Sequence, residues 1–193
     1  MINKDRDISA QARGKMMVIS APSGTGKDTV ISQVLQLREG VLLSISATTR
    51  PPRQGEENGK AYFFVTKERF GDMISADEFL EYAEYVGEFY GTPKKPVYDA
   101  IESGMDVIIE VEVKGAKQIM DAHPEALTVF IAPPSMEELE NRLRGRKTDS
   151  EQKLLERLEV ARYELGQKGL YKHTVINDEV LRAADEIISL LDA

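Results

Sequence analysis

Short apolar runs alternate along most of the chain with stretches whose apolar residues recur at helical spacing. Val30, Ile31, Val34 and Leu35 give one such helix face, and similar faces recur at 154–165 and 180–191. The apolar run at 107–113 is continuous, as in a parallel strand that is covered on both faces. This rhythm predicts an α/β fold. Buried strands are expected at 16–19, 41–43, 107–113, 127–131 and 174–176, and helices after the first strand, at about 96–103 and 115–120, from 135 onward and at the C-terminus.

Residues 46–93 break this rhythm. The segment 44–60 is rich in proline, glycine and polar residues, which predicts a long loop. After it we predict a strand at 62–65 and short helices at 67–74 and 77–80. Residues 81–93 alternate aromatic and polar side chains, as strands with one solvated face do. We therefore expect an inserted mixed α/β lobe at 46–93, between core segments 15–45 and 94–193, and a mobile N-terminal extension at 1–14.

Composition narrows the class of protein without naming its chemistry. The 193 residues are 41% hydrophobic and 30% charged, which suits one globular domain with a substantial core. The formal net charge of −8 argues against nonspecific nucleic-acid binding, because that requires a basic face. The chain contains no cysteine, and no run approaches the ~18 apolar residues of a membrane span. We expect a cytoplasmic protein without nucleic-acid or membrane partners; the oligomeric state stays open.

The most informative stretch is the turn at 20–29, called the phosphate loop below. It follows an apolar strand and opens a helix, and it contains Gly24, Gly26 and Lys27. The glycines allow the backbone to close around an anion, so that N–H groups at the head of the helix point inward. Lys27 adds a positive charge where the outer phosphates of a nucleotide would lie. The loop predicts a phosphate site.

Two residues depart from the usual G-x-x-x-x-G-K-[ST] pattern. Ala21 stands in place of the first glycine, and Asp28 replaces the hydroxyl residue that normally faces magnesium. Ala21 should fit if its φ is negative. Asp28 could ligate the metal, hold a metal-bound water, or only complement the helix N-terminus. The alternative to a phosphate site is a strand–turn–helix corner with an exposed lysine.

Other charged residues gather in three places along the chain. Arg50 and Arg53 flank two prolines, and two guanidinium groups on a stiff loop suit a monophosphate or carboxylate, although both could be solvated. Basic residues cluster from 142 to 157 around Gly145, between two predicted helices, where a lid could close on phosphates or a helix face could be solvated. Glu110 and Glu112 share one side of a strand end, as metal ligands, a base, or charges that start the next helix.

Taken in order, these motifs resemble the guanylate kinase family. The matching segments run from about residue 16 to the C-terminus: APSGTGK (21–27), TTRPPRQGE (48–56), NGK-x-Y-x-F (58–64), YGT (90–92), GA (115–116), FIAPPS (130–135) and VIND (175–178). The resemblance implies a P-loop nucleoside monophosphate kinase fold. That fold has a five-stranded parallel core sheet flanked by helices, an inserted GMP-binding lobe, and a helical lid at about 142–157. The implied reaction is transfer of the γ-phosphoryl group of Mg-ATP to GMP, and to dGMP.

The resemblance also implies roles for individual residues. The implied catalytic residues are Lys27, Arg50, Arg142, Arg146 and Arg157. The implied ATP-binding residues are Ala21, Pro22, Ser23, Gly24, Thr25, Gly26, Lys27, Asp28, Thr29 and, near adenine, Asn177. The implied GMP-binding residues are Ser46, Arg50, Arg53, Tyr62, Glu81, Tyr90, Thr92 and Glu112. Asp28 and Glu110 are the candidate magnesium ligands, directly or through water; they follow from the residues themselves, since Asp28 departs from the family pattern.

The chemistry of guanine agrees with this assignment. Guanine offers N1–H and an amino group to a carboxylate such as Glu81, and its O6 can accept from the Thr92 hydroxyl. Adenine lacks that pair of donors and would leave a buried Glu81 unsatisfied. Two other functions stay open. One is a noncatalytic module like the guanylate-kinase-like domains of scaffold proteins, which bind phosphopeptides, and the other is a kinase for a different phosphorylated acceptor.

Overall fold

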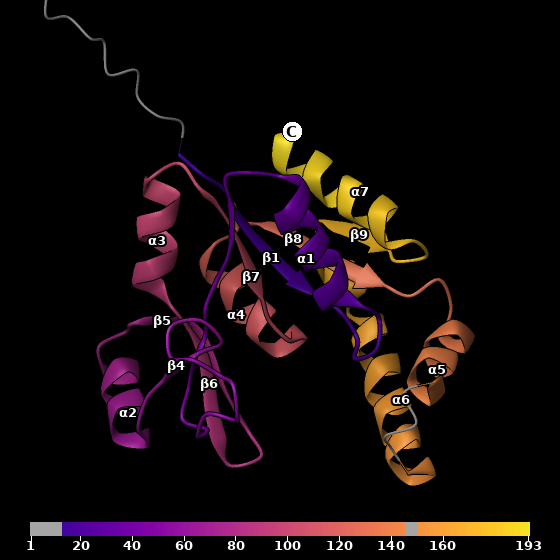
Figure 1. Cartoon of the computed structure of the whole chain (residues 1–193), viewed down its shortest axis with the longest axis horizontal. Coiled ribbons are helices and arrows are strands. Elements are labelled where there is room, and N and C mark those ends of the chain that lie inside the picture. Colours follow the sequence, from indigo (N-terminus) through magenta and orange to yellow (C-terminus); the bar gives the residue numbers. More distant parts are fainter. Residues whose placement is uncertain (1–12, 146–149) are drawn as a thin grey trace, which may run out of the picture.

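A five-stranded parallel sheet forms the centre of the molecule, as the sequence predicts (Figure 1). The computed structural model describes residues 13–145 and 150–193. Every neighbouring pair of strands in this sheet is parallel, and β1 lies in the middle. The strands are, from one edge to the other, β2 (Val41–Leu43), β7 (Asp106–Glu110), β1 (Met16–Ser20), β8 (Leu127–Ala132) and β9 (His173–Ile176).

Helices cover both faces of the core sheet because its central strands are apolar on both sides. In β1, Met17 and Ile19 face one apolar cluster and Val18 faces the other. The first cluster includes residues of α1 and α7, and the second includes residues of α3 and α4. These helices are α1 (Lys27–Leu37), α3 (Lys94–Glu102), α4 (Val113–Ala122) and α7 (Val180–Asp192).

A second, mixed sheet forms within residues 46–93. Its strand order is β4 (Phe63–Phe64), β3 (Ala47–Thr48), β6 (Glu88–Pro93) and β5 (Phe79–Tyr85), with β3 and β4 parallel and the other pairs antiparallel. Helix α2 (Lys67–Ser75) packs against it, with the Phe70 and Phe79 rings stacked 4.4 Å apart. The alternation at 81–93 is thus confirmed as two paired strands.

Two details of this region differ from the prediction. The expected helix at 77–80 is wrong, because Asp77 has a positive φ of 54° that no α-helix continues, and β5 already begins at Phe79. The expected loop at 44–60 contains β3, a strand of two residues. Ala47 and Thr48 are fully buried in that strand by pairing with both β4 and β6, a tertiary contact that local composition does not encode.

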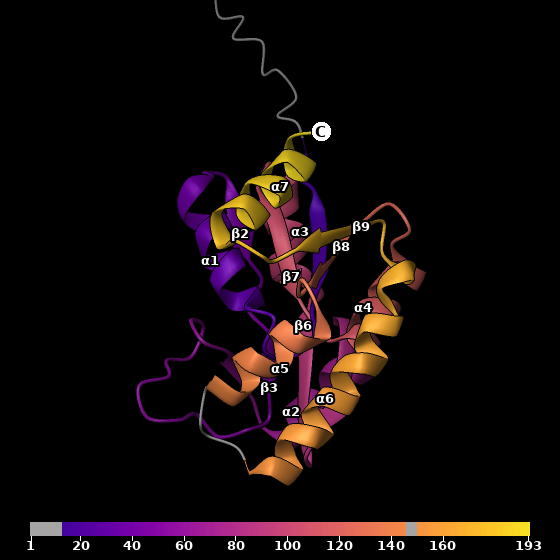
Figure 2. The same cartoon turned by 90° about the vertical axis from the view of Figure 1, so that its right-hand side faces the viewer.

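Helices α5 (Met136–Gly145) and α6 (Glu151–Gly166) form a pair with its own apolar cluster (Figure 2). The predicted Ser135 cap is present, since its Oγ accepts from the Glu138 N–H at 3.0 Å. Leu154 and Leu158 are buried in the pair, whereas Leu155, expected on the same face, is 54% exposed. Figure 1 shows the 46–93 lobe and this pair extending from the same end of the core, on opposite sides. After α6 come the short 3₁₀ helix η1 (Lys168–Leu170) and β9.

The start of the expected N-terminal extension, residues 1–12, lies outside the described residues. Within the described part, the Gly14 N–H donates to the Ile101 carbonyl at 2.9 Å, so the fold already holds the chain at this residue. Across 13–145 and 150–193, no helix is long and apolar enough to cross a membrane.

Candidate active site

The phosphate loop has the geometry of an anion-binding turn. Gly24 and Gly26 have φ angles of 92° and 91°, in the left-handed region that other residues rarely adopt. Gly26 is the N-cap of α1, and no side chain caps this helix. The first N–H groups of a helix have no intrahelical partner, so these donors can serve a phosphate. Ala21 is not among the positive-φ residues, which explains why alanine fits there.

Side chains from distant parts of the chain hold this loop. The Thr25 carbonyl accepts from Arg142 Nη1 at 3.1 Å and from Asn177 Nδ2 at 2.7 Å. Arg142 also donates through Nη2 to the Asn177 carbonyl. Arg157 Nη2, from α6, donates to Ser23 Oγ at 2.6 Å. Two of the expected lid arginines thus contact the phosphate loop directly, and Arg146 lies outside the described residues.

Lys27 forms an ion pair at the carboxyl end of the neighbouring strand. Its Nζ lies 2.7 Å from Glu110 Oε1, and Glu110 ends β7 beside β1. The expectation that Glu110 and Glu112 share one strand face is wrong. The strand stops at Glu110, and Glu112 is the N-cap residue of α4, because the helix begins only one residue later. Both glutamates nevertheless line the same cavity as Lys27.

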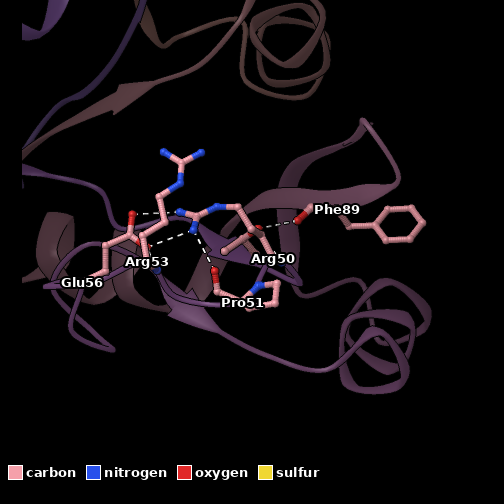
Figure 3. Close-up of polar contacts among 6 residues, drawn as sticks. Arg50, Pro51, Arg53, Glu56 and Phe89 are labelled. Carbon is pink, nitrogen blue, oxygen red and sulfur yellow. Dashed lines mark hydrogen bonds and ion pairs between the residues drawn. The ribbon is translucent and has the colours of Figure 1, made fainter.

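The loop at 50–56 is closed by one carboxylate (Figure 3). Glu56 accepts from both terminal nitrogens of Arg50, at 2.9 and 3.0 Å, and from the Arg53 N–H at 2.6 Å. These hydrogen bonds hold the pKa of Glu56 below its usual range. The Arg50 guanidinium also lies over the Tyr62 ring, 5.4 Å from its centroid.

A cavity of about 960 Å³ is lined by residues of the core, of the lobe and of α6. Lys27 and Glu110 line its core side, and Glu81 lines it from β5. Other residues of the expected GMP site that line it are Ser46, Tyr62, Tyr90 and Glu112. Tyr62 and Tyr90 meet edge to face, 6.1 Å apart.

Glu81 is a carboxylate held in a nearly closed environment. It is 7% exposed, and burial raises its pKa above the usual glutamate value. Oε1 accepts from the Thr92 hydroxyl at 2.7 Å, across the paired strands β5 and β6. Thr92 is itself fully buried, and its hydroxyl donates its hydrogen bond to Glu81. The sequence-based expectation was that this hydroxyl donates to the O6 of guanine.

Comparison with known proteins decides the family. The family model for guanylate kinase matches residues 13–193. The chain belongs to the guanylate kinase family. A guanylate kinase of Prochlorococcus marinus (strain MIT 9313) is 46% identical over 183 residues, covering 95% of this chain and 97% of that protein. A guanylate kinase of Synechococcus sp. (strain JA-3-3Ab) is 45% identical over 179 residues, covering 93% of this chain and 82% of that protein.

A crystal structure of guanylate kinase from Anaplasma phagocytophilum is similar over most of the chain. It is 34% identical, with a TM-score of 0.74, and the alignment covers 94% of this chain and 86% of that one. The resemblance drawn from the motifs is therefore confirmed, as is the fold class.

One residue that lines this cavity was not predicted from the sequence. Glu164, on α6, lines the cavity, and its pKa is raised to about 7. Partial burial is the main cause, the Glu112 charge adds to it, and Lys27 opposes it. In the sequence, Glu164 lies on a helix with other charged residues and carries no local signal. Only the folding of α6 toward the phosphate loop brings it to the site.

The donor set suits a magnesium ion that arrives with its nucleotide. Mg²⁺ prefers oxygen ligands and is commonly held by one or two carboxylates together with phosphates and water. In the described ranges, no three His, Cys, Asp or Glu side chains gather as a metal site. Asp28 is exposed in the first turn of α1, and Glu110 lies beside Lys27. Both side chains are oxygen donors of the kind that Mg²⁺ prefers, and among the described residues no preformed cage surrounds either of them.

Proposed function

We propose that this chain is an ATP:GMP phosphotransferase that converts ATP and GMP into ADP and GDP. The observation that carries the proposal is the cavity that Lys27 and Glu81 both line. A phosphate-binding lysine and a base-reading carboxylate on one cavity suit an acceptor with a phosphate and a guanine. Family membership supports the same reaction. ATP, GMP and the ion are the expected partners, and the cytoplasm is the expected compartment.

On the acceptor side, we assign the base to Glu81 and the phosphate to the loop at 50–56. Glu81 accepts from N1–H and the amino group of guanine, with Thr92 fixing one of its oxygens. Arg50 and Arg53 bind the phosphate, with Tyr62 and Tyr90 beside it, and Ser46 and Glu112 complete the base-binding end. None of these residues is assigned to the ribose 2′-hydroxyl, so we expect dGMP to be accepted as well.

On the donor side, the phosphate loop holds the triphosphate of ATP. Its N–H groups, with Ser23 and Thr29 hydroxyls nearby, face the phosphates, while Lys27 exchanges Glu110 for the transferred group. Arg157 and Arg146 neutralise charge that develops during transfer, and Arg142 and Asn177 hold the loop next to the adenine side. Bound through Asp28 and Glu110, magnesium would neutralise phosphate charge and orient the outer oxygens.

Phosphoryl transfer asks little covalent chemistry of these side chains. The acceptor phosphate is already an anion, so the residues align two phosphates and neutralise their charge. The arginines and Lys27 supply this charge, and no general base is assigned. Closing the cavity excludes water, which would otherwise accept the phosphoryl group.

A coupled assay of ADP production tests the proposal. ADP should form with magnesium, ATP and GMP together, and far more slowly with AMP, UMP or CMP. A Lys27→Met variant should lose turnover while keeping its fold. Tight GMP binding without turnover would support the noncatalytic module instead. Turnover with another monophosphate and not with GMP would support a kinase for a different acceptor.

A further inference from the structure

Helix α4 contains a buried glycine in its first turn. Gly115 is the third residue of the helix and is buried against β5. Glycine is the least favourable residue inside a helix apart from proline, because it loses the most backbone freedom. The φ of Gly115 is not in the left-handed region, so backbone geometry does not require glycine here. The residue therefore calls for another physical reason.

The space beside Gly115 is filled by the Glu81 carboxylate. A Cβ placed on Gly115 would lie 2.6 Å from Glu81 Oε2 and 3.2 Å from Glu81 Cδ, both too close for ordinary contact. By contrast, a Cβ on Gly71, inside helix α2, would meet nothing within 4 Å. The missing side chain at 115 is thus matched to one carboxylate.

Glu81 has little room to avoid such a contact. Its Oε1 is held at 2.7 Å by the Thr92 hydroxyl, and Thr92 is fully buried on the paired strand β6. Its Oε2 lies against the first turn of α4, where the helix dipole favours a negative charge. The Glu81 carboxylate is enclosed between β6 and α4, which fixes its orientation toward the cavity. Glu81 and Gly115 both line this cavity.

We propose that Gly115 is a positioning residue, which makes room for the Glu81 carboxylate so that the cavity selects a purine with adjacent ring N–H and amino donors. This inference rests on the proposed function, with GMP as the acceptor. An alanine at 115 would push the carboxylate out of line with the two donors, although it would favour the helix itself. Loss of base recognition without loss of the fold is the signature of this role.

Gly115→Ala and the matched control Gly71→Ala test the proposal. In Gly115→Ala, kcat/KM for GMP should fall by about tenfold to a hundredfold, mainly through KM, because hydrogen bonds to a charged acceptor are lost. The preference for GMP over IMP, which lacks the amino group, should shrink. ATP affinity should stay at the wild-type value, and the thermal midpoint should not fall, because alanine favours the helix. Gly71→Ala should leave kcat/KM for GMP, the GMP/IMP preference and ATP affinity unchanged, and should raise only the thermal midpoint slightly, because alanine replaces glycine at an exposed helix position.

Glu81→Asp supplies a rescue, because it draws the carboxylate back by one methylene. In the wild-type background, Glu81→Asp should weaken GMP turnover. In the Gly115→Ala background, the same substitution should weaken GMP turnover much less, or restore it. Wild-type GMP kinetics and GMP/IMP preference in Gly115→Ala would overturn the inference and leave the proposed function standing. Loss of ATP binding or of the fold in Gly115→Ala would also overturn it, by showing a structural role. A wild-type chain without GMP turnover would overturn both.

Discussion

Glu81 shows how a single side chain joins burial to selectivity. The carboxylate is 7% exposed and keeps one oxygen bonded to Thr92, so its remaining acceptor capacity is directed to the cavity. Glu81→Gln preserves the shape but turns part of the acceptor into a donor that faces guanine donors. We expect kcat/KM for GMP to fall by an amount equivalent to about 2–4 kcal/mol of lost transition-state stabilisation. ATP affinity should change little.

Steady-state kinetics with both substrates measures this effect. Glu84→Gln is the matched control, because Glu84 is an exposed residue of the same strand and lines the same cavity. It should change kcat/KM by no more than about twofold, as surface substitutions usually do. Unchanged GMP turnover in Glu81→Gln would mean that Glu81 only packs and that the base is recognised elsewhere.

Asp28 places a negative charge in the first turn of α1, next to Lys27. Without metal, a carboxylate about 5 Å from a triphosphate should weaken ATP binding by about 1–3 kcal/mol at surface-like dielectric. With magnesium between the two charges, the repulsion should vanish. Asp28→Ser should therefore tighten metal-free ATP binding and change Mg-ATP binding much less. Calorimetry with and without chelator measures both, and equal effects in the two conditions would show that Asp28 does not sense the ion.

Glu164 should make stability depend on pH. Its pKa is raised to about 7 in the folded chain, so the folded state holds this proton more tightly than the unfolded state between about pH 4.5 and 7. The resulting stability is fully present below that window and is lost as pH rises through 7. Because the side chain is partly exposed, we expect a loss of about 1 kcal/mol.

Urea unfolding of the nucleotide-free protein measures the Glu164 effect. Glu164→Gln should be more stable than the wild type at pH 8, and the gap should close toward pH 5. Glu156→Gln, an exposed change on the same helix, serves as the control and should follow the wild-type profile. If Glu164→Gln follows it too, Glu164 does not titrate in this range.

At the scale of elements, the loop at 50–56 is organised before any phosphate arrives. Glu56 holds Arg50 and the Arg53 backbone in one closed loop. Glu56→Ala should leave this loop without a fixed conformation. GMP binding must then order the loop, at a free-energy cost of about 1 kcal/mol. We expect KM for GMP to rise by about fivefold, with KM for ATP unchanged.

The neighbouring Glu57→Ala is the control for the loop, because Glu57 pairs with Lys60 at the surface. It should leave both KM values near the wild type. The opposite result, a lower KM for GMP in Glu56→Ala, would mean that Glu56 competes with the phosphate for Arg50 and does not organise the loop.

For the whole molecule, the cavity is lined from two sides, by the lobe and by α6. Tyr85 borders it from the lobe, and Val160 and Tyr163 border it from α6; all three are more than half exposed. Exposed apolar side chains on two facing parts favour closure, which would bury them and exclude water. With GMP and a nonhydrolysable ATP analogue together, small-angle scattering should report a smaller radius of gyration than with either alone. An unchanged radius would contradict closure.

The sequence by itself determined the core sheet, the helices on its faces and the phosphate loop. These features depend on neighbours in the chain: apolar periodicity marks the buried strands and helix faces, and Gly24 and Gly26 supply φ angles that other residues avoid. The departure at Ala21 was only conditionally predictable, because the sign of its φ, which decides whether alanine fits, comes from the structure.

Only the tertiary structure decided which distant groups meet. Strand β3 exists because β4 and β6 pair with it, and Glu164 reaches the cavity because α6 folds back toward the phosphate loop. The match of Gly115 to the Glu81 carboxylate joins residues 34 positions apart. Such contacts depend on how elements pack, to within an ångström, and hydrophobic periodicity fixes which face is buried but not what it touches.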